Sequence, residues 1–293
     1  MPGLLTTAEA ADYLRLSERK LYDLVLTGAV PCTKITGRWL FPKAALDRWI
    51  ADGLPGAAGK PVPPPIVGGS HDPLLEWALR ESGSRLASLP EGSEAGLVRL
   101  QQGEVAVAAI HLHRIDGDDD RANADALALL PGLHDGVLIA FAQREQGLLT
   151  PPGNPRGLSD IVGVAASGAR LAQRPDGAGA QLLLLSLLSR HGLTPADVSS
   201  IKPVCPTGPD VAQAIRADRA DCGIATRAVA LAAGLDFIPL AWERYDLAMR
   251  QRDYFQPGPF ALFRFLRTSA FADRAAELGG YDVSEAGSVR QLN

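Results

Sequence analysis

The chain has 293 residues, of which 46% are hydrophobic and 21% charged, with a formal net charge of −4. This composition excludes wholesale disorder and collagen-like repeats, and the length allows one large domain or two unequal ones. No apolar run approaches the roughly 18 residues of a membrane span, and no export signal is evident. Only three scattered cysteines occur. We therefore expect a cytoplasmic protein with no membrane partner and no disulfide framework.

The first 52 residues carry the boundary signals of short helices and one hairpin. Thr6 and Glu9 fit a capping box at the start of a first helix, and Ser17 is placed to cap a second helix. The dipeptide Thr36-Gly37 fits a two-residue hairpin turn, and Pro42 suits the first turn of a third helix. This order of helix, tight turn, helix, hairpin and helix is the layout of a winged helix-turn-helix.

Basic and aromatic side chains gather on the surfaces that such a domain presents to DNA. The second helix turns Leu21 and Val25 to one side, which leaves Arg19 facing the other way. The hairpin adds Lys34 and Arg38 for contacts to the DNA backbone or the minor groove. The predicted DNA-binding residues are Ser17, Arg19, Lys20, Tyr22, Lys34, Arg38 and Trp39.

Charge is distributed unevenly along the chain. Residues 15–48 carry a net charge of +4, so the rest of the chain carries −8. An acidic domain binds DNA poorly, which confines the expected contact with double-stranded operator DNA to the N-terminal segment. Since a single small helix-turn-helix makes few contacts, we expect a homodimer on a pseudo-palindromic site.

Short motifs mark this segment, namely Thr7-x-Glu9-Ala10-Ala11-x-x-Leu14, Ser17-x-Arg19-x-Leu21-Tyr22, and Gly37-Arg38-Trp39 followed by Pro42. With these motifs, residues 4–50 resemble the excisionase and MerR-type DNA-binding domain. A Gly- and Pro-rich stretch follows, which cannot hold a helix and predicts a semi-rigid, extended linker. We therefore divide the chain into a DNA-binding domain (1–52), a linker (53–65) and a larger domain (66–293).

The larger domain alternates apolar strand-like runs with helical patterns, which indicates an α/β sheet built from βαβ units. Expected strands of a first lobe are 85–89 and 105–110, and the run 137–142 begins a crossing into a second lobe. The second lobe is expected to hold strands near 162–165, 201–204 and 222–225 and helices at 180–191 and 209–217, with a return at 237–240 and 245–249. Two such lobes form a cleft at the carboxyl ends of their strands, where ligands usually bind.

Several βα junctions of this domain carry glycine or small polar residues where helix N-termini begin. Converging helix N-termini make an anion site from unpaired amides and positive dipole ends. Arg174 and His111 add charge-assisted contacts, and Tyr245 offers a hydroxyl. The predicted anion-binding residues are Ser70, His71, Ser93, His111, Arg174, Gly177, Ala178, Gly179, Thr207 and Tyr245.

The order of several motifs extends this interpretation, among them Gly69-Ser70-His71-Asp72-Pro73, Gly92-Ser93-x-x-Gly96-Leu97 and Arg174-x-x-Gly177-x-Gly179. With them, nearly all of 66–290 resembles the cytoplasmic substrate-binding domain related to type 2 periplasmic binding proteins, the kind associated with molybdate or tungstate. That family commonly has a Gly-Ser-Gly-Thr-Arg type run after the arginine and a histidine at a later helix. Here Ala178, Ala180, Gln181 and Gly208 stand instead, which makes a smaller or singly charged anion such as formate plausible.

Catalytic and metal chemistry are the alternatives for this cleft. Ser70, His71 and Asp72 are contiguous, so one backbone cannot aim all three into a catalytic triad, and we expect no enzyme. His111 and His113 lie two apart and suggest a metal pair, but no third ligand stands out, so we expect neither a metal site nor a cofactor.

The sequence therefore predicts a one-component transcriptional regulator with a winged helix-turn-helix and a two-lobed α/β anion sensor. The alternative is an intracellular carrier or storage protein for molybdate-type oxyanions, with the N-terminal domain as a docking module. A third interpretation is an excisionase-like architectural factor whose large domain no longer senses a ligand. The identity of the anion, the target genes and the choice between activation and repression stay open.

Overall fold

The computed structural model describes residues 3–26, 30–35, 37–53, 62–114 and 119–292. The chain forms two compact units, Met1–Pro61 and Val62–Asn293. Most of the predicted linker, namely residues 54–61, lies outside the described residues. None of the helices in the described part of the chain has the length and apolar character needed to span a bilayer.

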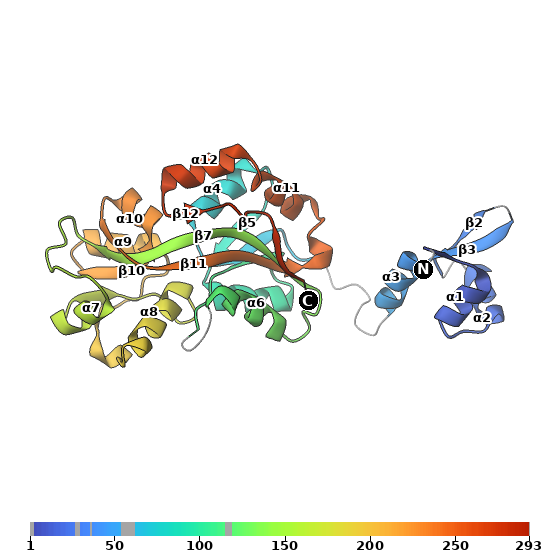
Figure 1. The fold of residues 1–293 in the computed structure, drawn as a ribbon, viewed down its shortest axis with the longest axis horizontal. Helices are drawn as coiled ribbons and strands as arrows, with labels where there is room; N and C mark the ends of the chain where they lie inside the picture. The colour runs from blue at the N-terminus through green and yellow to red at the C-terminus, as the bar shows by residue number, and fades with distance from the viewer. Residues whose placement is uncertain (1–2, 27–29, 36, 54–61, 115–118, 293) are drawn as a thin grey trace. The chain divides into compact units, whose positions relative to one another are not determined.

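The N-terminal unit has the predicted order of helix, helix, hairpin and helix, with one additional strand, β1, before the first helix (Figure 1). Its elements are β1 (Leu4–Leu5), α1 (Thr7–Tyr13), α2 (Glu18–Leu26), β2 (Thr33–Ile35), β3 (Arg38–Pro42) and α3 (Lys43–Gly53). The strands form a sheet of order β1-β3-β2, with β2 and β3 paired as an antiparallel hairpin. Thr36 of the predicted turn and Thr27 beyond the second helix lie outside the described residues.

The capping box predicted for the first helix is present. The Thr6 hydroxyl accepts a hydrogen bond from the Glu9 backbone N–H at 3.4 Å, and the Glu9 carboxylate accepts one from the Thr6 N–H at 2.8 Å. Leu21 of α2 is fully buried against α1 and the hairpin, and Phe41 of β3 belongs to the same core. Burial of Leu21 fixes which face of α2 points to solvent.

The larger unit has two lobes, each with its own hydrophobic cores. The first lobe contains β4 (Ile66–Gly69), α4 (Pro73–Glu81), β5 (Ala87–Pro90), α5 (Ser93–Gln102), β6 (Val107–Ile110), α6 (Asp119–Leu129), α11 (Pro257–Phe265), α12 (Ser269–Leu278), β12 (Tyr281–Asp282) and β13 (Val289–Leu292). The second contains α7 (Ile161–Ser167), β8 (Arg170–Ala172), α8 (Gly179–Arg190), β9 (Ser199–Ser200), α9 (Gly208–Arg216), β10 (Cys222–Thr226) and α10 (Arg227–Ala233).

Two long antiparallel strands, β7 (Gly136–Thr150) and β11 (Asp236–Arg250), run side by side through both lobes (Figure 1). The main path of the sheet is β5-β4-β6-β11-β7-β10-β8-β9, with parallel pairing within each lobe and β12 and β13 added to β7. Helices cover both faces of this sheet (Figure 1). The predicted two-lobed α/β architecture with a double crossover is therefore confirmed.

Two predicted strands of the second lobe are wrong. Residues 162–165 lie in helix α7, because the Asp160 carboxylate caps it by accepting from the Gly163 N–H at 2.7 Å, and Ile161 and Val164 form its buried face. Residues 201–204 are not a strand either, since β9 ends at Ser200. Pro203 has no N–H to donate to a neighbouring strand, which opposes an extension of the pairing there.

Candidate functional site

A small, partly open cavity of about 20 Å³ lies between the two lobes of the larger unit. It lies at the carboxyl ends of β4, β6 and β10 and at the first turns of α4, α8 and α9. This is the edge at which α/β sheets usually hold their ligands. The lining residues are Ser70, His71, Pro73, His111, Arg144, Gln146, Arg174, Ala180, Gly208, Ala225, Thr226 and Val229.

Four of the predicted anion-binding residues line this cavity, namely Ser70, His71, His111 and Arg174. Ser70 is held at the end of β4 by its backbone N–H, which donates to the Ala109 carbonyl at 2.8 Å. The His71 Nε2 atom lies 3.2 Å from a carboxylate oxygen of Glu76, one turn along α4. The strand ends therefore bring these four residues to one cavity, and their role in anion binding stays a prediction.

Three other predicted residues use their hydroxyls elsewhere. The Ser93 hydroxyl donates to the His111 carbonyl at 3.0 Å and accepts from the His111 N–H at 3.1 Å, so it fixes the backbone of that histidine. Thr207 caps α9 in a capping box. Tyr245 is fully buried, and its hydroxyl donates to the Ser70 carbonyl at 2.5 Å. These three residues therefore hold in place the backbone and the helix start that border the cavity.

The run from Gly177 to Gly179 forms a contact between the lobes. The Gly177 carbonyl accepts a hydrogen bond from the Glu94 N–H at 3.3 Å. A Cβ atom at Gly179 would overlap the His111 carbonyl oxygen, so only glycine fits at this position in the observed arrangement. The start of α8 therefore lies directly against the end of β6, with the two lobes closed on each other.

A buried charged network missed by the sequence analysis spans β7 and β11, the two strands that connect the lobes and are called the hinge strands below. Arg144 of β7 and Glu243 of β11 are cross-strand partners, and Arg144 Nε donates to Glu243 Oε1 at 2.6 Å. Arg144 also donates to Asp72 at 2.7 Å, and its guanidinium lies 4.0 Å from the centre of the Tyr245 ring. Only 1% of Arg144 is exposed. Charged residues inside an otherwise apolar strand are the signal that would have found this network.

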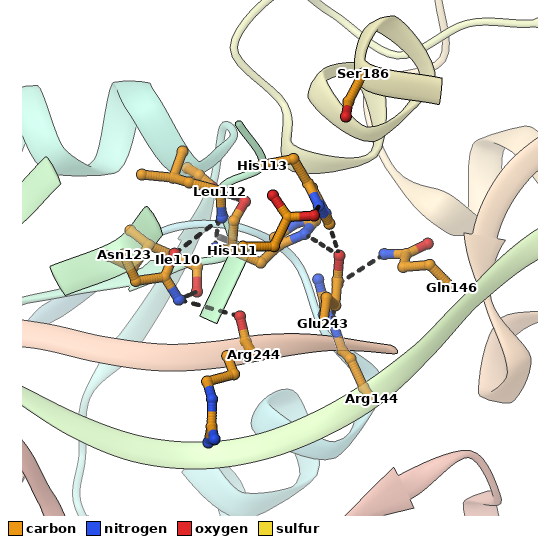
Figure 2. Close-up of polar contacts among 12 residues, drawn as sticks. Ile110, His111, Leu112, His113, Asn123, Arg144, Gln146, Ser186, Glu243 and Arg244 are labelled. Atoms are coloured by element: carbon orange, nitrogen blue, oxygen red, sulfur yellow. Dashed lines mark hydrogen bonds and ion pairs between the residues drawn. The ribbon is translucent and has the colours of Figure 1, made fainter. Parts of the chain in front are cut away.

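Both imidazoles that follow β6 point at Glu243 (Figure 2). His111 Nδ1 and His113 Nε2 each lie 2.8 Å from Glu243 Oε2, while Gln146 Nε2 donates to Oε1 at 2.9 Å. The Nδ1 atom of His113 faces an Asp119 oxygen at 3.5 Å. Glu243 of β11 therefore contacts side chains of β7 and of the segment that follows β6.

Burial and nearby charges shift the pKa values of the two imidazoles in opposite directions. Burial, together with the neighbouring Arg144 charge, lowers the pKa of His111 to about 4 despite the Glu243 carboxylate. For His113, burial is outweighed by hydrogen bonds to Asp119 and Glu243, which raise its pKa to about 9. Burial also opposes ionisation of Glu243, but the imidazoles and Arg144 hold the pKa of its carboxyl well below the usual range. At neutral pH, His111 is neutral while His113 and Glu243 are charged.

Three residues that line the cavity each carry a buried polar atom with no hydrogen-bond partner among the described residues, namely Gln146 Oε1, Arg174 Nε and Thr226 Oγ1. Arg174 donates from its NH2 group to the Pro206 carbonyl at 2.7 Å. Burial and the like charge of Arg144 lower the pKa of the Arg174 guanidinium to about 10. Buried polar atoms normally find partners, so these three mark a place where a ligand would supply them.

The predicted DNA-binding residues all lie on the surface of the N-terminal unit or close to it. Ser17 accepts a hydrogen bond from the Lys20 N–H at 3.3 Å at the start of α2. Lys34 Nζ lies 5.3 Å from the centre of the Trp39 ring across the hairpin, and Trp39 is half-buried against the core. The exposed members of the predicted set are Ser17, Arg19, Lys20, Tyr22, Lys34 and Arg38.

Comparison with known families matches both units. Residues 4–53 match the model of a helix-turn-helix domain, and residues 76–267, about two thirds of the chain, match that of a PBP superfamily domain. These are families of DNA-binding and substrate-binding domains respectively. The fold assigned from the structure and the family assignment therefore agree.

Individual relatives extend the comparison to the whole chain. YvgK of Bacillus subtilis, an uncharacterized protein, is 23% identical over 97% of this chain and 96% of its own length. The solved structure of a cysteine-to-serine mutant of Corynebacterium glutamicum OxyR, bound to H2O2, has 15% identity and a TM-score of 0.51, covering 92% of this chain and 90% of that one.

A tungstate ABC transporter structure from Geobacter sulfurreducens has 15% identity and a TM-score of 0.53, covering 72% of this chain and 97% of its own. At these identities the solved structures establish a shared fold. With two lobes joined by β7 and β11 and a family match over residues 76–267, the chain belongs to the PBP superfamily.

Proposed function

We propose that the protein is a one-component transcriptional regulator whose helix-turn-helix binds operator DNA and whose interlobe cleft senses a small anion. The observation that supports an anionic ligand is the set of unpartnered polar atoms in the residues that line the cavity. Arg174 Nε and the Thr226 hydroxyl are donors without an acceptor among the described residues. An anion supplies acceptors to both, and its charge offsets that of Arg174.

Helix N-termini add to this preference for an anion. Ala180 and Gly208 border the cavity at the first turns of α8 and α9, which have 12 and 9 residues. The first N–H groups of a helix have no partner within it, and the helix dipole favours negative charge there. Two such ends on one cavity make a site that needs few full positive charges.

The size of the cavity favours a compact ligand. About 20 Å³ has room for a water-sized group or slightly more, so any anion requires the lobes to part, and a tetrahedral oxyanion requires a wider opening than a three-atom carboxylate. Ala178, Ala180 and Gly208 also contribute no side-chain donors. We therefore place a small carboxylate such as formate beside molybdate and tungstate as the anions to test.

The sensing step follows from the hinge. A ligand that binds the closed form more tightly than the open form shifts the population towards closure. In a homodimer, closure would change the placement of the two DNA-binding units on a pseudo-palindromic operator.

Anion binding is tested by thermal unfolding of the full chain with molybdate, tungstate, sulfate, formate and other small carboxylates. A ligand at 100 times its dissociation constant adds about 2.7 kcal/mol of stability, which is readily measured. A response to one of these anions supports the cleft as a sensor site. If none of them raises the unfolding temperature, the sensing half of the proposal is wrong.

DNA binding is tested with Arg19→Ala combined with Arg38→Ala, both exposed on the N-terminal unit. Arg264→Ala, an exposed arginine in α11, is the control for loss of charge. We expect the double variant to lose binding to its own promoter fragment and to keep the anion response, because the two sites lie in different units. An anion response in a protein that retains no promoter fragment at physiological salt would instead favour the carrier function.

A further inference from the structure

The side chains of His111, His113 and Glu243 bring three potential metal-ligating atoms together at the edge of the cleft. Their ligand atoms all lie within 4.8 Å of one another. Figure 2 shows both imidazoles directed at one carboxylate, although they come from the end of β6 and the carboxylate comes from β11, 130 residues further along. We propose that these three residues bind one divalent transition-metal ion of the zinc type.

The donor set selects the class of metal. Two imidazole nitrogens and one carboxylate oxygen suit zinc and neighbouring transition metals, whereas calcium and magnesium prefer oxygen ligands alone. With metal–ligand bonds of about 2.0–2.1 Å, tetrahedral ligand atoms stand roughly 3.3 Å apart. The observed 2.8 Å separations of each imidazole nitrogen from Glu243 Oε2 require adjustments of about half an ångström to reach that spacing. Such adjustments are within reach of side-chain rotation.

The surrounding groups orient these ligands in the way that metal sites require. The second oxygen of Glu243 is held by Arg144 and Gln146, which leaves Oε2 directed at the imidazoles. Asp119 faces the remaining nitrogen of His113 at 3.5 Å, the outer carboxylate of a carboxylate–histidine–metal arrangement. Such outer contacts fix the ring orientation and the tautomer. The site is therefore built in two layers.

Three protein ligands leave a fourth coordination position for water or a ligand. His111 also lines the anion cavity, so a metal ion here would add positive charge beside the cleft. This link to the anion rests on the proposed function, but the metal site itself does not. By reciprocity, any factor by which the metal tightens anion binding must equally tighten metal binding in the presence of the anion.

The competing interpretation is that the three side chains only hydrogen-bond one another. In that case each imidazole donates an N–H to Glu243 Oε2, and no ion is needed. A metal ion would replace both N–H···O contacts. The charged His113 would release one proton to solvent, whereas the neutral His111 would keep its single proton by carrying it on Nε2 instead of Nδ1. Direct measurement of metal binding separates the two interpretations.

The experiment uses the full chain without a histidine tag, stripped with a chelator and desalted, and titrated with Zn²⁺ alone against a competing indicator. We expect one equivalent bound with a dissociation constant tighter than about 10 µM, and d–d absorption bands when Co²⁺ replaces Zn²⁺. Glu243→Gln should weaken binding by more than about 100-fold, and Asp119→Asn by about 10- to 100-fold. His134→Gln, at an exposed histidine, is the matched control and should bind like the wild type.

Binding weaker than about 10 µM in the wild-type chain, or equal loss in the His134 and Glu243 variants, would overturn the proposal. If Glu243→Gln fails to fold by circular dichroism, the Asp119 variant compared with the His134 variant decides. Because neither anion nor DNA is present, failure of the metal site leaves the anion screen unaffected. The converse also holds, so the two proposals fail separately.

Discussion

The Thr226 hydroxyl offers the sharpest test of the cleft, because stability and binding are expected to move in opposite directions. Thr226 lies at the end of β10 as the cross-strand partner of Gln146, and it is 6% exposed. Its Oγ1 atom has no hydrogen-bond partner in the described part of the chain, and it makes no cap bond to α10. Thr226→Val therefore removes a buried polar atom and no interaction that the structure records.

The magnitude follows from the cost of an unsatisfied hydroxyl. A buried polar atom without a partner costs about 1–3 kcal/mol, so Thr226→Val should stabilise the ligand-free protein by roughly 1 kcal/mol. For a unit of this size, that corresponds to a rise of about 2–4 °C in unfolding temperature. A hydrogen bond to a charged ligand contributes about 1.5–3 kcal/mol, so anion affinity should fall by roughly 10- to 100-fold.

Thr150→Val is the matched control. Thr150 Oγ1 is likewise without a partner among the described residues, and the residue is fully buried, but it is not among the residues that line the cavity. Calorimetric unfolding without ligand and anion titration should show similar stabilisation of both variants and loss of affinity in Thr226→Val alone. Equal anion affinity in the two variants would refute the assignment of the Thr226 hydroxyl to the ligand site.

Two further predictions concern closure and acid stability. Gly179→Ala places a Cβ against the His111 carbonyl, so α8 must retreat by about 1 Å, and small-angle scattering should show a more open unit with weaker anion binding. Gly163→Ala is the control, because the nearest atom to a Cβ at that position is 3.4 Å away, and it should change neither the scattering nor the anion affinity. Scattering from Gly179→Ala that matches the wild type would contradict the reasoning. Hydrogen bonds from Arg170 lower the pKa of Asp221 to about 2, so the stability it contributes is complete above about pH 4 and is lost as the pH falls through 2. Asp221→Asn should lower the free energy of unfolding by about 1–2 kcal/mol at pH 7 and reduce its dependence on pH between about 4 and 2. If the variant lost stability with falling pH as steeply as the wild type, this assignment to Asp221 would be wrong.

The architecture was largely predictable because its signals are local. The Thr6–Glu9 capping box, the buried side of α2 and the alternation of strands with helices each depend on residues within a few positions. The wrong strand at 162–165 shows the limit of such signals. A short apolar run fits either a strand or a helix, and the cap from Asp160 decided it.

The site was less predictable because its polar network is non-local. Ser70 and His111 directly follow strands, so their local position already indicates that they lie near the ends of the strands. Glu243 lies 132 residues from His111 in the sequence, and their contact depends on the pairing of β6 with β11, which no local pattern specifies. The absence of a metal ligand set was expected for the same reason, since the third candidate ligand comes from a different strand.

The placement of Arg144 and Glu243 on β7 and β11 has a consequence for engineering. These strands connect the two lobes and also carry two buried charges of the site, so a redesign of specificity there would also alter the opening of the lobes. Arg174 and Thr226, by contrast, border the cavity from the second lobe alone. A biosensor with a new ligand preference is best evolved from those two positions, with the strand pair left unchanged.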